Sequence, residues 1–111
     1  MRLNYSTASP YVRKVMACAI ARGIDGRLEK LTTNPHQSPP ELLGVNPLSK
    51  VPALLLDDGA ALYDSPVICE YLDGLGDAPP LFPPPGPARW AALRQQALGD
   101  GIMDASVPRR R

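Results

Sequence analysis

Apolar positions in the first thirty residues predict a strand, a helix and a second strand. Residues 2–5 are a short candidate strand, and Ser9-Pro10 then offers a hydroxyl cap and a first-turn proline, which favour a helix start. Apolar residues recur at helical spacing until Gly23, which favours helix termination: Val12, Val15, Met16, Ala19 and Ile20. With a second candidate strand at residues 27–31, this unit predicts a parallel strand pair.

Prolines and glycines interrupt residues 32–47, so we expect an irregular segment there, with room for one short turn of helix around residues 41–44. Beyond it, residues 53–56 and 61–63 flank Asp57-Asp58-Gly59. The Asp-Gly pair favours the tight turns whose twist matches that of paired strands. We therefore expect an antiparallel hairpin at the end of the sheet.

Two more helices follow in the pattern. Ser65-Pro66 repeats the helix-opening pair, and the next apolar face ends where glycines interrupt it: Val67, Ile68, Tyr71, Leu72 and Leu75. Residues 88–103 again carry apolar side chains every third or fourth position, including Trp90, Leu93, Ala97, Leu98 and Ile102. A lone helix cannot bury such a face by itself.

The predicted order is β-α-β-α-β-β-α, which is an α/β, thioredoxin-like domain with a mixed four-stranded sheet. Six prolines fall between Pro79 and Pro87 and indicate a linker. We therefore divide the chain into a domain at residues 1–76, a linker at 77–87, and residues 88–111, which hold one further helix.

Length and charge limit the classes of function. A chain of 111 residues with 44% hydrophobic side chains supports one core and an appendage. The net charge of +1 creates no overall attraction for nucleic acid or an anionic membrane, and we read the three arginines at 109–111 as a solvated tail. Without a basic leader or a long apolar run, we expect a cytoplasmic protein.

The two cysteines, Cys18 and Cys69, are far apart in the sequence and form no C-x-x-C motif. No histidine lies near either of them, so we expect no metal site. We predict two reduced thiols with a structural role.

Three short motifs together resemble the N-terminal domain of glutathione transferases over about residues 1–82. Residues 9–14, SPYVRK, resemble the first helix start of the serine-type bacterial members. Residues 46–54, NPLSKVPAL, resemble the segment with the cis-proline of the fold, and residues 62–68, LYDSPVI, resemble the acidic-serine motif before the third helix. Each motif alone is weak evidence, but their order is specific.

The first motif also resembles the C-P-Y-C of glutaredoxins with both cysteines replaced. The hydroxyl of Ser9 cannot form a mixed disulfide, but it can donate a hydrogen bond to the thiolate of glutathione at a helix N-terminus. The resemblance makes Ser9 the catalytic residue, although the residues alone are equally consistent with a simple N-cap. Tyr5 is the rival hydroxyl and Ser6 a lesser one, whereas we read Tyr11 as packing near the helix start.

The second motif implies a cis peptide bond before Pro52, which would expose the backbone of Val51 to an extended peptide such as glutathione. An ordinary trans proline that enters a strand is the alternative. Lys50 can reach a ligand carboxylate or simply be solvated. His36, in the irregular segment, is a weaker candidate for contact with the glycine end of the ligand.

The third motif places Ser65 as a helix cap with Asp64 before it. Free N–H groups at a helix start bind carboxylates, so we expect the γ-glutamyl carboxylate at Ser65 and its ammonium at Asp64 or at a neighbouring subunit. Simple capping is the alternative. No residue in these motifs suggests a metal.

The resemblance implies that glutathione is bound as co-substrate and that its thiolate attacks a small electrophile. A non-catalytic glutathione-binding or regulatory module is the second interpretation. A disulfide reductase is disfavoured because no cysteine stands at the start of the first helix. Members of the family continue into an all-helical domain, so residues 88–111 resemble only its beginning, as in a truncated chain. We expect a homodimer or self-association, because Trp90, Leu93 and the outward face of the third helix should be exposed.

Overall fold

The structure is a computed structural model that describes residues 1–6, 9–32, 46 and 50–106. Its elements in chain order are β1 (Arg2–Tyr5), α1 (Pro10–Ala21), the 3-10 helix η1 (Asp25–Arg27), β2 (Glu29–Thr32), β3 (Ala53–Leu55), β4 (Ala61–Leu62), α3 (Ser65–Asp73) and α4 (Pro87–Ser106). The helical turn predicted around residues 41–44 and the three terminal arginines lie outside these ranges.

The four strands form one mixed sheet in the order β2-β1-β3-β4. Strand β1 runs parallel to β2 and antiparallel to β3, with Leu3 opposite Lys30 on one side and Leu54 on the other. Strand β4 returns antiparallel to β3 and pairs Leu62 with Leu54. This arrangement confirms the predicted thioredoxin-like fold.

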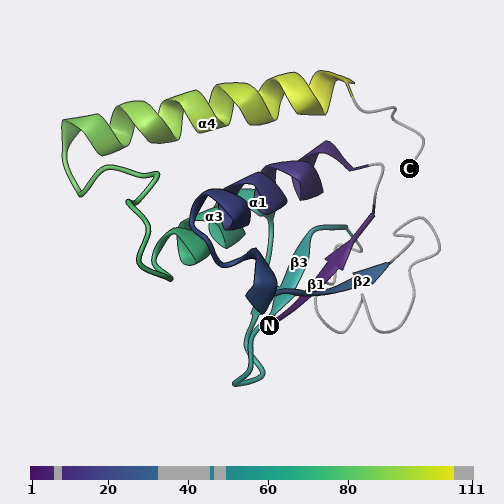
Figure 1. The fold of residues 1–111 in the computed structure, drawn as a ribbon. Coiled ribbons are helices and arrows are strands. Elements are labelled where there is room, and N and C mark those ends of the chain that lie inside the picture. The colour runs from purple at the N-terminus through teal and green to yellow at the C-terminus, as the bar shows by residue number, and fades with distance from the viewer. Residues whose placement is uncertain (7–8, 33–45, 47–49, 107–111) are drawn as a thin grey trace.

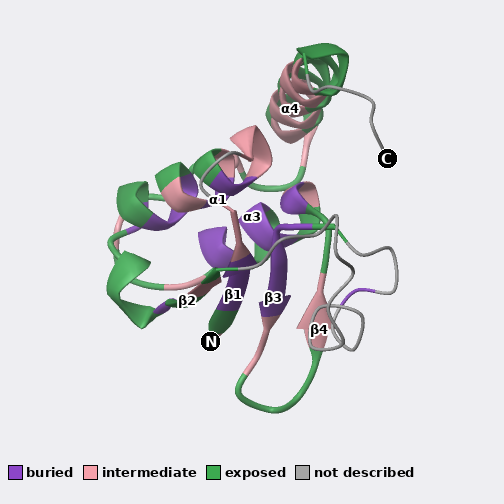
Figure 2. Ribbon diagram, turned by 90° about the vertical axis from the view of Figure 1, so that its right-hand side faces the viewer, coloured by how far each residue is buried: buried purple, intermediate pink, exposed green. Residues whose placement is uncertain are grey.

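Helices α1 and α3 lie side by side against the sheet, and α4 crosses above them (Figure 1). The core forms where these two helices meet the sheet, and Figure 2 shows the buried residues concentrated there. Its fully buried apolar side chains include Leu3, Val15, Leu54, Ile68 and Leu72. Leaving one such side chain exposed instead would cost about 1.5–3 kcal/mol.

The first helix begins as the sequence predicts, since Ser9 is its N-cap and Pro10 its first residue. The buried face of the helix, however, was predicted wrongly in part. Ile20 is 61% exposed, while Cys18 and Arg22 are buried in its place. The buried residues 12, 15, 18, 19 and 22 follow the helical repeat around one face, and position 20 falls outside that arc.

Several predicted boundaries shift by one or two residues. The second strand begins at Glu29 instead of residue 27, because Asp25–Arg27 form the 3-10 turn. Helix α3 ends at Asp73, so Leu75 lies beyond it, and Val67 on its outer side is 46% exposed. The hairpin forms as expected, with Gly59 at a φ of 91° in the turn.

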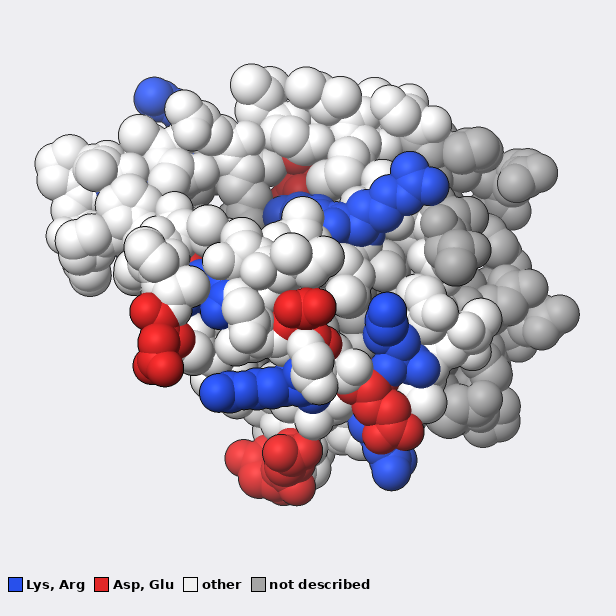
Figure 3. Space-filling view, in the orientation of Figure 1, with Lys and Arg blue, Asp and Glu red and all other residues white. Residues whose placement is uncertain are grey.

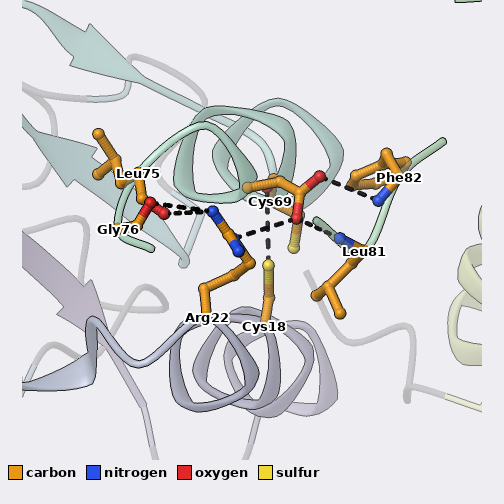
Figure 4. Close-up of polar contacts among 8 residues, drawn as sticks. Cys18, Arg22, Cys69, Leu75, Gly76, Leu81 and Phe82 are labelled. Atoms are coloured by element: carbon orange, nitrogen blue, oxygen red, sulfur yellow. Dashed lines mark hydrogen bonds and ion pairs between the residues drawn. The ribbon is translucent and has the colours of Figure 1, made fainter. Parts of the chain in front are cut away.

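A buried ion pair joins the end of α1 to the end of α3. Arg22 Nη2 donates hydrogen bonds to the carbonyl oxygens of Leu75 (2.6 Å) and Gly76 (3.4 Å), and Arg22 Nε lies 3.5 Å from Asp73 Oδ1. Asp73 in turn accepts from the backbone N–H groups of Leu81 (2.6 Å) and Phe82 (2.9 Å), as Figure 4 shows for the labelled partners. The pair therefore fixes where the chain leaves α3.

Helix α4 is longer than predicted and has no buried residue. It is held to α1 by Lys14 and Asp100, whose nitrogen and oxygen lie 2.9 Å apart, and to α3 by Arg89 and Glu70, at 2.8 Å. Its other side carries the strongly exposed Trp90, Leu98 and Ile102, whereas the predicted patch member Leu93 is half-buried. None of the helices in the described ranges is long and apolar enough to cross a membrane.

Candidate functional site

A small cavity of about 120 Å³ lies where α1, α3, α4 and the segment before β3 meet. It brings together the five predicted glutathione-contact residues, and the described residues that line it are Tyr11, Lys50, Val51, Pro52, Asp64, Ser65 and Asp104. These residues come from four separate parts of the sequence. The fold thus gathers the second and third motifs at one place.

The N-terminus of α1 lies beside this cavity through Tyr11. The hydroxyl oxygen of Ser9 accepts a hydrogen bond from the backbone N–H of Val12 at 3.2 Å, so Ser9 is a helix cap. The backbone N–H of Ser9 donates to the carbonyl of Ser6 at 3.2 Å. Tyr5 is half-buried and packs against Val12 and its apolar neighbours. His36 lies outside the described residues.

The segment before β3 is held by a buried amide. Asn46 is 1% exposed, and its side-chain nitrogen donates to the carbonyl of Lys50 at 3.0 Å. Val51 and Pro52 are buried, the peptide bond between them is cis, and Lys50 is exposed. The backbone beside the cavity is therefore fixed by a side-chain contact, while the lysine remains accessible to solvent.

The start of α3 differs slightly from the prediction. Asp64 is the N-cap residue, without a side-chain capping bond, and Ser65 is the first residue of the helix. Ser65 is only 2% exposed, and Lys14 Nζ lies 3.4 Å from its hydroxyl oxygen. An ammonium group and the N-terminus of a helix therefore place positive potential around this serine.

Acidic groups balance this positive charge. The two carboxylate oxygens of Asp100 accept hydrogen bonds from Lys14 Nζ, at 2.9 and 3.1 Å. The hydroxyl of Tyr11 donates a hydrogen bond to the carboxylate of Asp104. Basic and acidic side chains are also interspersed over the face in Figure 3. The site thus offers groups of both signs, as a zwitterionic ligand needs. Within the described ranges, no three His, Cys, Asp or Glu side chains cluster as they would around a metal ion.

Sequence reasoning missed the residues that α4 brings to the site. Tyr11 and Lys14 are three apart on α1, and Asp100 and Asp104 are four apart on α4, so each pair shares a helix face. The spacing shows that each pair lies on one helix face. It does not show that the two faces meet, because no local sequence pattern predicts that α4 crosses over the start of α1.

Comparison with known proteins fits this geometry. Residues 8–75 match the family model described as "Glutathione S-transferase, N-terminal domain", and they make up more than half of the chain. The chain belongs to the glutathione S-transferase family.

Individual relatives agree with this assignment. The chain is 35% identical over 107 residues to the "Uncharacterized GST-like protein YibF" of Escherichia coli strain K12, covering 96% of this chain and 52% of that protein. It superposes with a TM-score of 0.88 and 47% identity on a glutathione transferase family member from Pseudomonas fluorescens Pf-5 with bound glutathione, covering 95% and 52% of the two chains.

A third relative is a glutathione S-transferase from Methylobacillus flagellatus KT, also solved with glutathione bound. The TM-score is 0.83 and the identity 41%, over 95% of this chain and 51% of the other. The chain therefore spans about half the length of these glutathione S-transferase relatives.

Proposed function

We propose that this chain binds glutathione in the cavity at the start of α3 and stabilises its thiolate for attack on a small electrophile. The observation that carries the proposal is that Lys50, Val51, Pro52, Asp64 and Ser65 line one cavity. The relatives solved with bound glutathione support the choice of ligand. On this basis the domain is residues 1–76, with a linker at 77–87 and a partial helical domain at 88–111.

The γ-glutamyl end would bind at Ser65. Its α-carboxylate would accept hydrogen bonds from the Ser65 hydroxyl and backbone N–H, because a helix N-terminus has N–H groups without intrahelical acceptors. Lys14 Nζ, 3.4 Å from the same hydroxyl oxygen, would add a charge of opposite sign. The ligand's ammonium would then face Asp64 and Asp104, which also line the cavity.

The middle of the ligand would pair with the backbone of Val51, in the manner of an added strand. Asn46 holds the preceding carbonyl and so orders that backbone before the ligand arrives. Lys50 would meet the glycine carboxylate, with His36 as a further candidate.

Ser9 would hold the thiolate. Its oxygen already accepts a bond from Val12 N–H, but a hydroxyl also carries one hydrogen that it can donate. A donated hydrogen bond and the positive end of α1 both favour the charged form of the thiol. Tyr5 and Ser6 remain the rival hydroxyls. This assignment would make the chain a serine-type member of the family.

The test measures binding and thiol ionisation separately. Calorimetric titration of glutathione into the Asp64→Asn variant should show weaker binding than the wild type, with Asp25→Asn, an exposed acid on η1, as the matched control. Ultraviolet titration of the bound thiolate should give a higher thiol pKa in Ser9→Ala than in the wild type. Equal pKa values in the two proteins would shift the role to Tyr5 or Ser6.

A non-catalytic glutathione-binding module is the second candidate, because the hydroxyl oxygen of Ser9 already serves as the cap of α1. The two candidates differ in turnover. Glutathione-dependent consumption of an aryl halide by the wild type, lost in Ser9→Ala, supports the transferase. Binding without turnover supports the module. For either candidate we propose a cytoplasmic protein that self-associates.

A further inference from the structure

We propose that Cys18 and Cys69 form an oxidisable dithiol, which a small peroxide converts to a disulfide that links α1 to α3. The two cysteines are 51 positions apart, yet Cys18 Sγ lies 3.6 Å from the carbonyl oxygen of Cys69. Figure 4 shows both sulfur atoms in the space between the two helices, directed toward one another. Both thiols are free. The proposal is independent of glutathione binding.

An oxidant can reach this pair through a second, larger cavity. The cavity has a volume of about 440 Å³ and lies between α1, α3, the linker and α4. Both cysteines line it, together with Lys14, Phe82, Asp100 and Met103 among others. One water molecule occupies about 30 Å³ of liquid, so a peroxide fits easily. The low exposure of Cys18 and Cys69, 7% and 3%, does not isolate them from small molecules.

The surroundings distinguish the two thiols. The hydrogen bond from the Cys69 side chain lowers the pKa of Cys18, with help from Arg22 and Lys14, against opposing effects of burial and of Asp73. The same hydrogen bond and burial raise the pKa of Cys69. Cys18 therefore ionises first, and the thiolate is the nucleophilic form of cysteine.

The reaction has two steps. The Cys18 thiolate attacks one oxygen of hydrogen peroxide, the O–O bond breaks, and the departing hydroxide takes up a proton to form water. The Cys69 thiol then loses its proton and attacks the sulfur of the Cys18 sulfenic acid, which forms the S–S bond and releases a second water. Two thiols lose two electrons and one peroxide gains them.

Peptide mapping of the whole, folded chain tests this step. The protein is treated with hydrogen peroxide, its remaining thiols are blocked with iodoacetamide in denaturant, and trypsin then releases residues 15–22 and 51–89, which contain one cysteine each. The expected product is these two peptides joined by a disulfide, with a yield independent of protein concentration and reversed by dithiothreitol. Free glutathione in a separate tube, treated with the same dose of peroxide, reports whether that dose was sufficient.

Variants that lack one cysteine show whether peroxide oxidises the remaining thiol when no disulfide can form within the chain. In Cys69→Ala, Cys18 should stop at the sulfenic acid and be trapped by dimedone, whereas in Cys18→Ala the thiol of Cys69 should react several-fold more slowly. Circular dichroism checks that each variant is folded. If a variant does not fold, the peptide map of the peroxide-treated wild type still shows whether the disulfide forms. Two fully alkylated cysteines after glutathione has been oxidised, or disulfides only between chains, would overturn the proposal.

Discussion

At the scale of single residues, Ser9 combines a structural contact with a proposed chemical one. Its hydroxyl oxygen caps α1 through Val12 N–H at 3.2 Å. We predict that Ser9→Ala lowers the free energy of unfolding by about 1 kcal/mol, as is typical for loss of such a cap. Ser9→Thr, which keeps both the cap and the hydroxyl, should match the wild type in urea denaturation. Equal stability of the Ala variant would show that the cap contributes little.

The ion pair of Arg22 and Asp73 should contribute more than any exposed pair. The two side chains are 3% and 8% exposed, and removing one partner leaves the other charge buried. We expect Asp73→Ala to lose about 3–5 kcal/mol of unfolding free energy. Glu29→Ala breaks the exposed pair with Arg2 and should lose about 0–1 kcal/mol. Similar losses in the two variants, measured by chemical denaturation, would contradict this account.

At the scale of elements, the turn after α3 depends on Gly76. Its φ is 76°, and an added Cβ would lie 2.8 Å from Ile24 Cγ2 and 3.0 Å from the carbonyl of Arg22. Gly23 has a similar φ of 70° but open space around it. Each Gly→Ala change should cost about 1–2 kcal/mol for the left-handed backbone, and only Gly76→Ala should add a steric penalty.

Thermal unfolding of the two variants measures this difference. Gly76→Ala should melt several degrees below Gly23→Ala, since about 1 kcal/mol shifts the melting temperature by roughly 4–8 °C in a domain of this size. Equal melting temperatures would mean that the turn can move away from Ile24 without cost.

The elements also show what local sequence can predict. Ser9-Pro10, Asp58-Gly59 and the apolar periodicity depend on near neighbours, and they correctly predicted the start of α1, the hairpin and a mixed four-stranded sheet. Arg22 was missed because a basic residue near a helix end is normally exposed, and its burial depends on Asp73, 51 positions away. The placement of Asp100 and Asp104 beside the site depends in the same way on how α4 crosses α1.

For the site itself, the sequence named five of the seven described residues that line the cavity, but through motifs that together resemble a known family. Without the family resemblance, the sequence around Ser65 predicts only a helix cap, and Lys50 is expected only to be a solvated lysine in a loop. Contacts such as that between Lys14 and Ser65 join segments 51 positions apart and follow from packing, not from spacing.

At the scale of the whole molecule, the exposed side of α4 should promote association. Trp90, Leu98 and Ile102 are 71%, 67% and 60% exposed, and apolar side chains gathered on one helix often mark an interface. We predict that the wild type self-associates at micromolar concentration in light scattering, and that Trp90→Arg with Leu98→Glu reduces this. Gln95→Glu, an exposed polar position on the same helix, is the control. A monomeric wild type would contradict the prediction.

Calorimetric titration of glutathione into the folded wild type and into Ser65→Ala tests whether the start of α3 holds glutathione. We predict saturable binding by the wild type. The variant should bind about tenfold or more weakly, because a hydrogen bond to a charged group is worth about 1.5–3 kcal/mol and tenfold in affinity is about 1.4 kcal/mol. No binding by the folded wild type, or equal affinity in the variant, would contradict the account.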